Sequence, residues 1–364
     1  MTRQAQLRQV SIALNMSGLG PMRFANFAAA VLLICLCTSG VRTEEETAER
    51  ARPASACGPA LESSRQPQPL SSAEECALKP KDVFKECDKC PEMVVVPSGS
   101  FTMGSPESDV GRYHDEGPQH TVTIARPFAV GKFHVTVDEF AAFVMDTGYD
   151  KGSDCWVFDG KWYTQKPSVS WRNPGFPQAG THPVVCLNWY DAKSYVDWLS
   201  RKTGKGYRFL TEAEWEYAAR ARTEPGGYTR YFFGDDENDL CRYGDVADKT
   251  AQSTIEGAEN WPVPQCSDGY AYTAPVGSFA PNDFGLYDMV GNAWQWNEDC
   301  YRSGYDRTPL DGSAWISGDC SRHVNRGASW SVFPRASRTA TRGSTSAEDQ
   351  YESIGLRVAR TLSP

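Results

Sequence analysis

The residues of this chain best suited to metal or redox chemistry are its twelve cysteines. Cys35 and Cys37 fall in a signal-like region near the N-terminus, and the others are spread over the rest of the chain. The downstream cysteines are Cys57, Cys76, Cys87, Cys90, Cys155, Cys186, Cys241, Cys266, Cys300 and Cys320. An even number in an exported chain favours disulfides, whose connectivity cannot be read from sequence alone.

Cys87 and Cys90 form a Cys-x-x-Cys motif, which in other proteins holds a metal or exchanges electrons. No second pair follows at zinc-finger spacing, and no histidine stands at the expected distance. The strand–helix pattern of a redox enzyme is also missing around the motif. A structural disulfide is therefore the prediction for this pair.

Serine and histidine could support nucleophilic or metal-assisted chemistry. Ser329 and Ser331 are possible nucleophiles, but the chain has no Gly-x-Ser-x-Gly elbow. Ser329 is instead expected to hydrogen-bond a substrate backbone or its own turn. No two of the histidines have the spacing of a helical pair, which disfavours a non-haem iron site. The histidines are His114, His120, His134, His182 and His323.

Composition limits the classes of function that remain. A formal net charge of −9 argues against nucleic-acid binding, which requires clustered Lys and Arg. The 31 Gly and 23 Pro indicate a fold rich in turns and irregular backbone.

The N-terminal region has the composition of a secretory signal. Arg23 precedes an apolar run over residues 24–36, which ends in small residues at 38–40, and Met22 could be the true start. An uncleaved anchor is the alternative, although the run is shorter than the ~20 residues of a bilayer span. Residues 1–40 are thus predicted to be a signal region, and the protein to be exported to the periplasm or the extracellular space. Any membrane contact is expected only through an uncleaved signal segment.

The elements that would position the chemistry begin after a polar stretch. Residues 41–90 are predicted to be a disordered linker, because they offer few large apolar side chains. Residues 91–364 then form one domain, with strands expected at 93–96, 100–103, 120–124 and 357–359. Capping boxes at Thr136 and Thr211 predict two helices, and Asn188 caps a third that ends at Gly204. Little regular structure is expected after residue 222.

Several motifs in a fixed order identify a resemblance. The chain is similar to the formylglycine-generating enzymes, or sulfatase-modifying factors, over about residues 91–362. The similarity implies a single compact α+β domain of low regular secondary structure, related to C-type lectins. The motifs that carry it are Val96-Pro97-Ser98-Gly99, His182-Pro183-Val184-Val185, Arg208-Phe209-Leu210-Thr211-Glu212-Ala213-Glu214-Trp215, Gly291-Asn292-Ala293-Trp294-Gln295-Trp296, Arg326-Gly327-Ala328-Ser329-Trp330 and Ile354-Gly355-Leu356-Arg357-Val358.

Structural calcium is a further implication of the resemblance. Carboxylate and backbone-carbonyl oxygens together are the ligands that Ca²⁺ prefers. Gln295 stands where the family usually has Glu, so Asp288 must carry more of the charge. One implied ligand set is Asp245, Val246, Asp268 and Tyr270, and the other is Asp288, Gly291, Ala293 and Gln295.

The resemblance also locates the copper-binding cysteine pair of the family, and this chain lacks it. An ungapped alignment puts Val332 and Ser337 at the two positions, and no cysteine follows Cys320. Because Cu(I) prefers soft thiolates, copper-dependent formylglycine formation is not expected. Iron is also not expected, since the family branches that use it carry ligands in a domain absent here.

A substrate cleft remains, with Ser329, Trp330, Trp294 and Arg335 as its candidate residues, alongside Trp296, Arg338 and Arg342. Aromatic rings and guanidinium groups suit peptides, sugars or carboxylates. The leading hypothesis is an exported protein that binds a protein, peptide or glycan partner through this cleft. The alternatives are an active formylglycine-generating oxidase and an accessory partner of such an enzyme. A disulfide between Cys300 and Cys320 is expected to close the loop beside the cleft.

Overall fold

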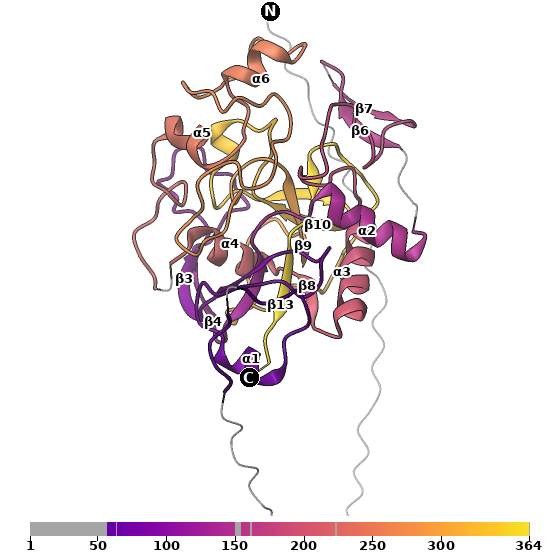
Figure 1. The fold of residues 1–364 in the computed structure, drawn as a ribbon. Helices are drawn as coiled ribbons and strands as arrows, with labels where there is room; N and C mark the ends of the chain where they lie inside the picture. Colours follow the sequence, from indigo (N-terminus) through magenta and orange to yellow (C-terminus); the bar gives the residue numbers. More distant parts are fainter. Residues whose placement is uncertain (1–56, 63, 150–153, 161, 223, 364) are drawn as a thin grey trace, which may run out of the picture. The chain divides into compact units, whose positions relative to one another are not determined.

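The computed structural model describes residues 57–364, apart from 63, 150–153, 161, 223 and 364. The predicted signal region, the possible start at Met22 and residues 41–56 lie outside the described residues. The described residues form one compact unit of mixed helices and strands, in agreement with the predicted α+β fold class (Figure 1).

A five-stranded antiparallel sheet carries the core, with the strand order β1-β2-β5-β13-β8. The C-terminal strand lies between two strands from earlier in the chain, so the end of the chain completes the sheet. All four residues of β2 are buried, which confirms the apolar run at 93–96 as a core strand. The strands are β1 (Val83–Phe84), β2 (Met93–Val96), β5 (Phe128–Gly131), β8 (Tyr207–Phe209) and β13 (Val358–Thr361).

A separate hairpin joins β3 (Gly99–Met103) to β4 (His120–Ile124), with Phe101 opposite Val122. The alternation in β4 is confirmed, because Val122 and Ile124 are buried while Thr121 and Thr123 are exposed. β3 therefore pairs with the later strand and not with β2. A second hairpin pairs β6 (Cys155–Phe158) with β7 (Tyr163–Lys166).

A four-stranded sheet after residue 222 was missed by the sequence pattern. Its order is β11-β10-β9-β12, with β12 parallel to β9. Buried polar residues such as Gln295, Asn297 and Asn325 replace the apolar alternation by which strands are recognised. The strands are β9 (Trp294–Cys300), β10 (Arg322–Arg326), β11 (Gly343–Ser346) and β12 (Ile354–Gly355).

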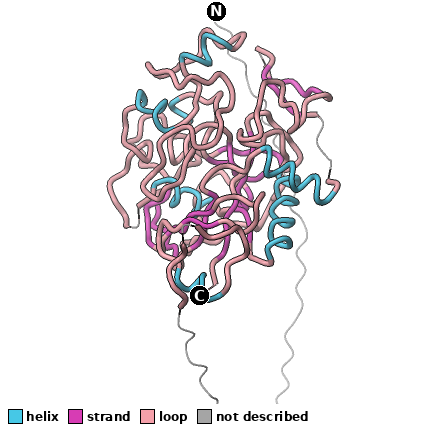
Figure 2. Tube along the Cα trace, viewed as in Figure 1, coloured by secondary structure: helices cyan, strands magenta, loops and turns pink. Residues whose placement is uncertain are grey.

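The three predicted helices are confirmed together with their capping boxes. Thr136, Asn188 and Thr211 each accept the N3 backbone N–H, and the N3 carboxylate returns to the cap. Gly204 ends its helix in the left-handed conformation, with φ of 67°. Figure 2 shows that loops make up most of the remaining trace. The α-helices are α1 (Ser72–Ala77), α2 (Val137–Thr147), α3 (Trp189–Thr203), α4 (Glu212–Arg220), α5 (Leu240–Tyr243) and α6 (Lys249–Thr254). Short 3₁₀ turns, η1 (Glu237–Asp239) and η2 (Pro334–Ala336), complete the helical elements.

The prediction of a disordered linker up to residue 90 is wrong for residues 57–90. This segment contains α1 and β1, and it buries Leu70 and Phe84 in the main core. Glu75 from α1 pairs with the fully buried Arg360 and lies 2.6 Å from Lys205 Nζ. A few buried anchors and one ion-pair network thus order a segment whose average composition is that of a linker.

Every cysteine from Cys57 onward is in a disulfide. The expected Cys300–Cys320 bridge is present, and Cys87 and Cys90 are bonded to each other as predicted. The remaining bridges are Cys57–Cys76, Cys155–Cys186 and Cys241–Cys266.

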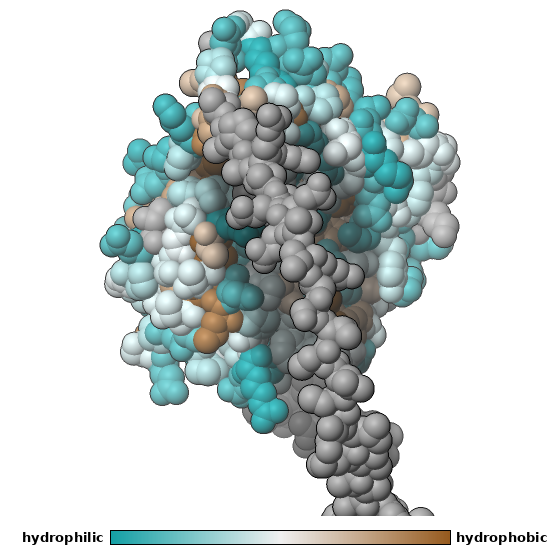
Figure 3. All heavy atoms as spheres, turned by 90° about the horizontal axis from the view of Figure 1, so that it is seen from below, coloured by the Kyte–Doolittle hydropathy of each residue, from teal (hydrophilic) through white to brown (hydrophobic). Residues whose placement is uncertain are grey.

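The face of the molecule in Figure 3 is mainly hydrophilic, with hydrophobic residues scattered over it in small groups. Among the described helices, none combines the length and apolar character needed to cross a bilayer.

Candidate functional site

Three aspartates in the irregular region between α5 and β9 lie close together. Asp248 caps α6 by accepting the Ala251 N–H at 2.9 Å, and its other oxygen accepts the Asp268 N–H at 2.5 Å. Asp245 is fully buried, and neither of its carboxylate oxygens has a hydrogen-bond partner among the described residues. Burial and the neighbouring carboxylates raise the pKa of Asp245 well above its usual range. Burial likewise raises the pKa of Asp268 to about 7.

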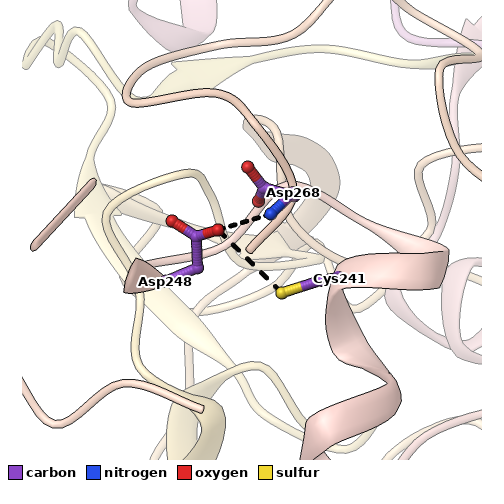
Figure 4. Close-up of side chains that lie close together, drawn as sticks. All are labelled: Cys241, Asp248 and Asp268. Carbon is purple, nitrogen blue, oxygen red and sulfur yellow. Dashed lines mark hydrogen bonds between the residues drawn. The ribbon is translucent and has the colours of Figure 1, made fainter. Parts of the chain in front are cut away.

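This acidic cluster fits a hard cation. Two unpartnered oxygens on a buried carboxylate leave a large desolvation cost, which a bound Ca²⁺ would offset. Figure 4 shows Asp248 beside Asp268 and Cys241. Cys241 is bonded to Cys266, so its sulfur is no thiolate ligand. Asp248 is a member that the sequence interpretation missed; its position directly before α6 was the available signal, since Asp is a preferred N-cap.

The second implied calcium set lies directly against the first. Gly291 has a φ of 77°, and a Cβ on it would lie 2.0 Å from the Asp245 carbonyl oxygen. The Asn292 N–H donates to that same carbonyl at 2.7 Å. The structure thus brings together two sets that are separate in the sequence, although their backbone contacts do not by themselves make a metal site.

The second set fits calcium less well than the first. Asp288 Oδ1 has no partner in the described part of the chain, as a ligand would require. Gln295 Oε1, however, already accepts from Trp215 Nε1 at 2.7 Å and from Arg357 Nε at 2.9 Å. The Ala293 carbonyl oxygen lies 2.8 Å from His134 Nε2. The fully buried Arg357 therefore places a positive charge beside the oxygens that a calcium ion would need.

The two aspartate loops hold residues 327–332, which we call the Ser-Trp segment, in place through hydrogen bonds to its backbone. The Gly291 N–H donates to the Gly327 carbonyl at 2.7 Å, and the Trp330 N–H donates to the Asn292 carbonyl at 3.2 Å. The Ala247 N–H donates to the Val332 carbonyl at 3.2 Å. The conformation of residues 327–332 therefore depends on both aspartate loops.

The aromatic cleft candidates separate into core and cavity residues. Trp296 is fully buried and donates its indole N–H to the Leu187 carbonyl at 3.0 Å, so it is a core residue. Trp294 is partly buried against the main core. Ser329 is buried, and its hydroxyl lies 3.3 Å from that of Ser331. Trp330 is also buried, but it lines a cavity.

The expectation that the arginines after Trp330 line a cleft is wrong for two of them. Arg342 is buried and pairs with Glu212, at 2.6 and 2.9 Å. Arg338 is buried between Glu116 and Asp109, with Nη1 2.8 Å from a carboxylate oxygen of each. These arginines were expected at a surface, because sequence alone does not reveal their distant acidic partners.

Arg335 is exposed, but it contacts a neighbouring loop. Its Nε donates to the Gly111 carbonyl at 3.0 Å, and its guanidinium lies 4.6 Å from the centre of the Tyr113 ring. The candidate residues therefore do not converge on one open groove.

The cavity beside Trp330 has a volume of about 90 Å³. It lies between the β6–β7 hairpin, the loops around Phe176 and Tyr272, and the approach to β12. Phe176 and Tyr272 stack at 4.6 Å, and Trp330 packs edge-on against Phe176. Its charged lining residues are Lys166 and Glu352.

Glu352 is the functional candidate that sequence reasoning missed. It is 2% exposed, and its Oε1 accepts the Phe158 N–H at 2.8 Å. Within the part of the chain that the structure describes, neither its Oε2 nor the Trp330 indole N–H has a hydrogen-bond partner. Burial raises the pKa of Glu352 to about 8. Its isolated place in a polar stretch gave no signal, because the residues that bury it come from other parts of the chain.

Further aromatic residues continue from the cavity to the surface. Phe158 contacts Tyr163 and Trp261, and Trp261 in turn contacts Phe333, with ring centres 5.5 to 5.9 Å apart. Tyr163 and Phe333 are exposed. We call these four residues the aromatic rim.

The two positions aligned with the copper cysteines, Val332 and Ser337, follow the cavity-lining Trp330 in the sequence. Ser337 is buried, and its hydroxyl donates to the Phe333 carbonyl at 3.1 Å. Val332 offers no side-chain ligand. Because Cys57 and all later cysteines are paired, none of them offers a thiol in the structure as described.

Comparison with known proteins adds three relatives. Residues 79–362 match a family model described as the sulfatase-modifying factor enzyme 1-like domain. The solved structure of PvdO from Pseudomonas aeruginosa is 40% identical, with a TM-score of 0.66, over 79% of this chain and all of that one. The formylglycine-generating enzyme of Thermomonospora curvata is 34% identical over 59% of this chain and 74% of its own length. The inactive C-alpha-formylglycine-generating enzyme 2 of Mus musculus is 30% identical over 74% and 85%.

Proposed function

This chain belongs to the sulfatase-modifying factor enzyme 1-like family, and from this premise we propose that it binds a partner without oxidising cysteine. The partner is a protein, peptide or glycan, and it binds at the aromatic rim and the cavity beneath it. The protein acts after export, in the periplasm or the extracellular space.

The observation that carries the proposal is the replacement of both copper ligands. Val332 and Ser337 stand at the cysteine positions, and the Ser337 hydroxyl hydrogen-bonds its own turn. Cu(I) sites need soft thiolate or thioether donors, which this segment does not supply. Family membership leaves both outcomes open, since its members include a formylglycine-generating enzyme and one named inactive. An active oxidase is therefore the second candidate.

Export is supported by the cysteine chemistry. Five disulfides are described, and such bonds persist in oxidising compartments rather than in the cytosol. The signal-like composition of residues 1–40 supports the same location.

Calcium has a structural role in this proposal. Asp245 and Asp268, with backbone oxygens of Val246 and Tyr270, would hold one ion beside the Ser-Trp segment. The ion would supply positive charge to a carboxylate that is buried without partners. The loop would then keep the Val332 backbone in place below the rim.

A Cu(I) titration separates the two candidate functions. Purified protein, with disulfides intact, competes for Cu(I) with a chromophoric chelator, and the Thermomonospora curvata enzyme is the positive control. The proposal expects no stoichiometric binding by this chain. Tight binding of one equivalent would favour the oxidase.

Binding at the rim is tested by a matched pair of tyrosine substitutions. Tyr163 on the rim is 41% exposed, and Tyr190 on α3 is 47% exposed. The two variants, Tyr163→Ser and Tyr190→Ser, are compared with the wild type on an oligosaccharide array and a peptide array. The proposal expects a ligand whose signal Tyr163→Ser reduces and Tyr190→Ser leaves unchanged. Equal signals from all three proteins would contradict binding at the rim.

A further inference from the structure

The cavity under the rim combines two features that favour a positively charged ligand. One is a buried carboxylate, Glu352, with an oxygen that has no partner among the described residues. The other is a wall of aromatic rings, formed by Phe158, Phe176, Tyr272 and Trp330. Aromatic faces attract cations, and rings around ammonium groups are a known mode of recognition.

An anionic or an apolar ligand would satisfy these groups less well than a cation. An anion would oppose the ionisation of Glu352, which burial already disfavours. An apolar ligand would leave Glu352 Oε2 without a partner. An ammonium group both donates to that oxygen and interacts favourably with the rings.

We propose that the cavity binds the alkylammonium group of a ligand, with Glu352 as its counter-ion and with Phe176, Tyr272 and Trp330 around it. The inference rests on the proposed function, because it names the part of the partner that enters below the rim. The unpartnered Trp330 indole N–H adds a donor for an acceptor next to the ammonium group. The volume of about 90 Å³ admits a small head group rather than a whole peptide or sugar chain.

The charged and titratable groups that act on Glu352 are few. Lys166 on β7 is exposed, and its positive charge slightly favours the ionised form of Glu352. The charge of Glu352 in turn contributes to raising the pKa of Tyr163, Tyr272 and Tyr351. Burial dominates and keeps the pKa of Glu352 at about 8 without ligand. A bound cation lowers that pKa, so binding at pH 7 releases a proton from Glu352.

The experiment titrates the purified protein, with its disulfides intact, with three amines by calorimetry. Tetramethylammonium represents a quaternary amine, N-acetyl-lysine amide represents a peptide amine, and glucosamine represents an amino sugar. At least one is expected to bind saturably, and Glu352→Gln is expected to weaken it at least about tenfold. Glu348→Gln, an exposed neighbour with the same change of charge, is the matched control and is expected to leave affinity unchanged.

Two readouts separate this role from a purely structural one. Wild-type affinity is expected to rise between pH 6 and pH 9, while that of Glu352→Gln stays flat. The wild-type heat should also vary with the ionisation enthalpy of the buffer at pH 7, since a proton is released. Phe176→Leu removes one ring and keeps the carboxylate, so it should weaken binding of the amine. It replaces Glu352→Gln as the test variant if that variant does not fold.

The outcomes divide cleanly. If none of the three amines binds, or if Glu352→Gln binds the amine as well as the wild type does, the inference is overturned. An array ligand sensitive to Tyr163→Ser would in that case still support the proposed function. Amine binding together with oxidation of a cysteine peptide would keep this inference and refute the proposed function.

Discussion

The buried Glu352 carboxylate makes stability depend on pH in a way that one substitution can reveal. Burial raises its pKa from an ordinary value of 4.5 to about 8. An acid with a raised pKa in the folded state is protonated there over a wider range than in the unfolded chain. The folded protein is therefore free of this cost below pH 4.5, loses stability as pH rises from 4.5 to 8, and loses little more above 8.

The magnitude follows from the two pKa values. With 1.36 kcal/mol for each pKa unit, the ionisation cost at pH 5 is about 1 kcal/mol, and at pH 9 it is about 5 kcal/mol. Glu352→Gln removes the titration and keeps an oxygen for the Phe158 N–H. The variant should thus gain about 4 kcal/mol relative to the wild type between pH 5 and pH 9.

Urea unfolding followed by tryptophan fluorescence at both pH values, without reductant, measures this difference. Comparing one variant at two pH values cancels constant effects of the new amide, such as an unpaired N–H. Glu348→Gln should show no such change, because its carboxylate is exposed. Parallel pH profiles for Glu352→Gln and the wild type would refute the reasoning that Glu352 is buried and unpaired.

Three further predictions concern the supports of the site. Calcium at a hundredfold excess over its Kd should stabilise the protein by about 2.7 kcal/mol. The gain is measured as a rise in melting temperature that EDTA reverses and that Asp245→Asn abolishes. An unchanged melting temperature would contradict the calcium assignment. Replacing Cys300 and Cys320 by Ala should cost about 3 kcal/mol in urea unfolding and should create no oxidase activity; a gain of activity would count against the disulfide's structural role. Arg342→Met should cost about 3–5 kcal/mol in the same assay, because the buried Glu212 loses its bidentate partner while Arg326 Nε stays 3.8 Å away. A loss below about 1 kcal/mol would show that Arg326 compensates the charge of Glu212.

The sequence specified those elements whose signals are local. The helix caps at Thr136, Asn188 and Thr211 lie within three residues of their partners, so their boundaries could be predicted closely. The strand at 93–96 was predictable because all four of its residues are apolar and buried. The fold class was predicted from the family motifs and their order, because the periodicity of helices and strands alone does not identify it.

Features that depend on distant contacts could not be predicted. The β9–β12 sheet buries polar side chains such as Gln295, which bonds to Trp215 and Arg357 from distant parts of the chain, and so it lacks the apolar alternation of a recognisable strand. Segment 57–90 is ordered by Glu75, whose partner Arg360 lies almost at the other end of the chain. Glu352 gains its raised pKa from burial by residues far from it in sequence.

The candidate site was predicted in part. The Ser-Trp segment does border the cavity through Trp330, and the Asp245 loop does hold that segment through the Ala247 N–H. The buried ion pairs of Arg338 and Arg342 were not foreseen, because their acidic partners come from other parts of the chain. Calcium binding remains a prediction for both aspartate loops.

The most direct test of the account is a turnover measurement with a Cys-x-Pro-x-Arg peptide. The protein is incubated with Cu(I), oxygen and a thiol reductant at a concentration that leaves its disulfides intact. Mass spectrometry then follows the peptide, with the Thermomonospora curvata enzyme as the positive control. The account predicts an unmodified peptide from this protein and formylglycine from the control. Formylglycine formed by this protein would contradict the claim that it binds a partner at the aromatic rim without oxidising cysteine.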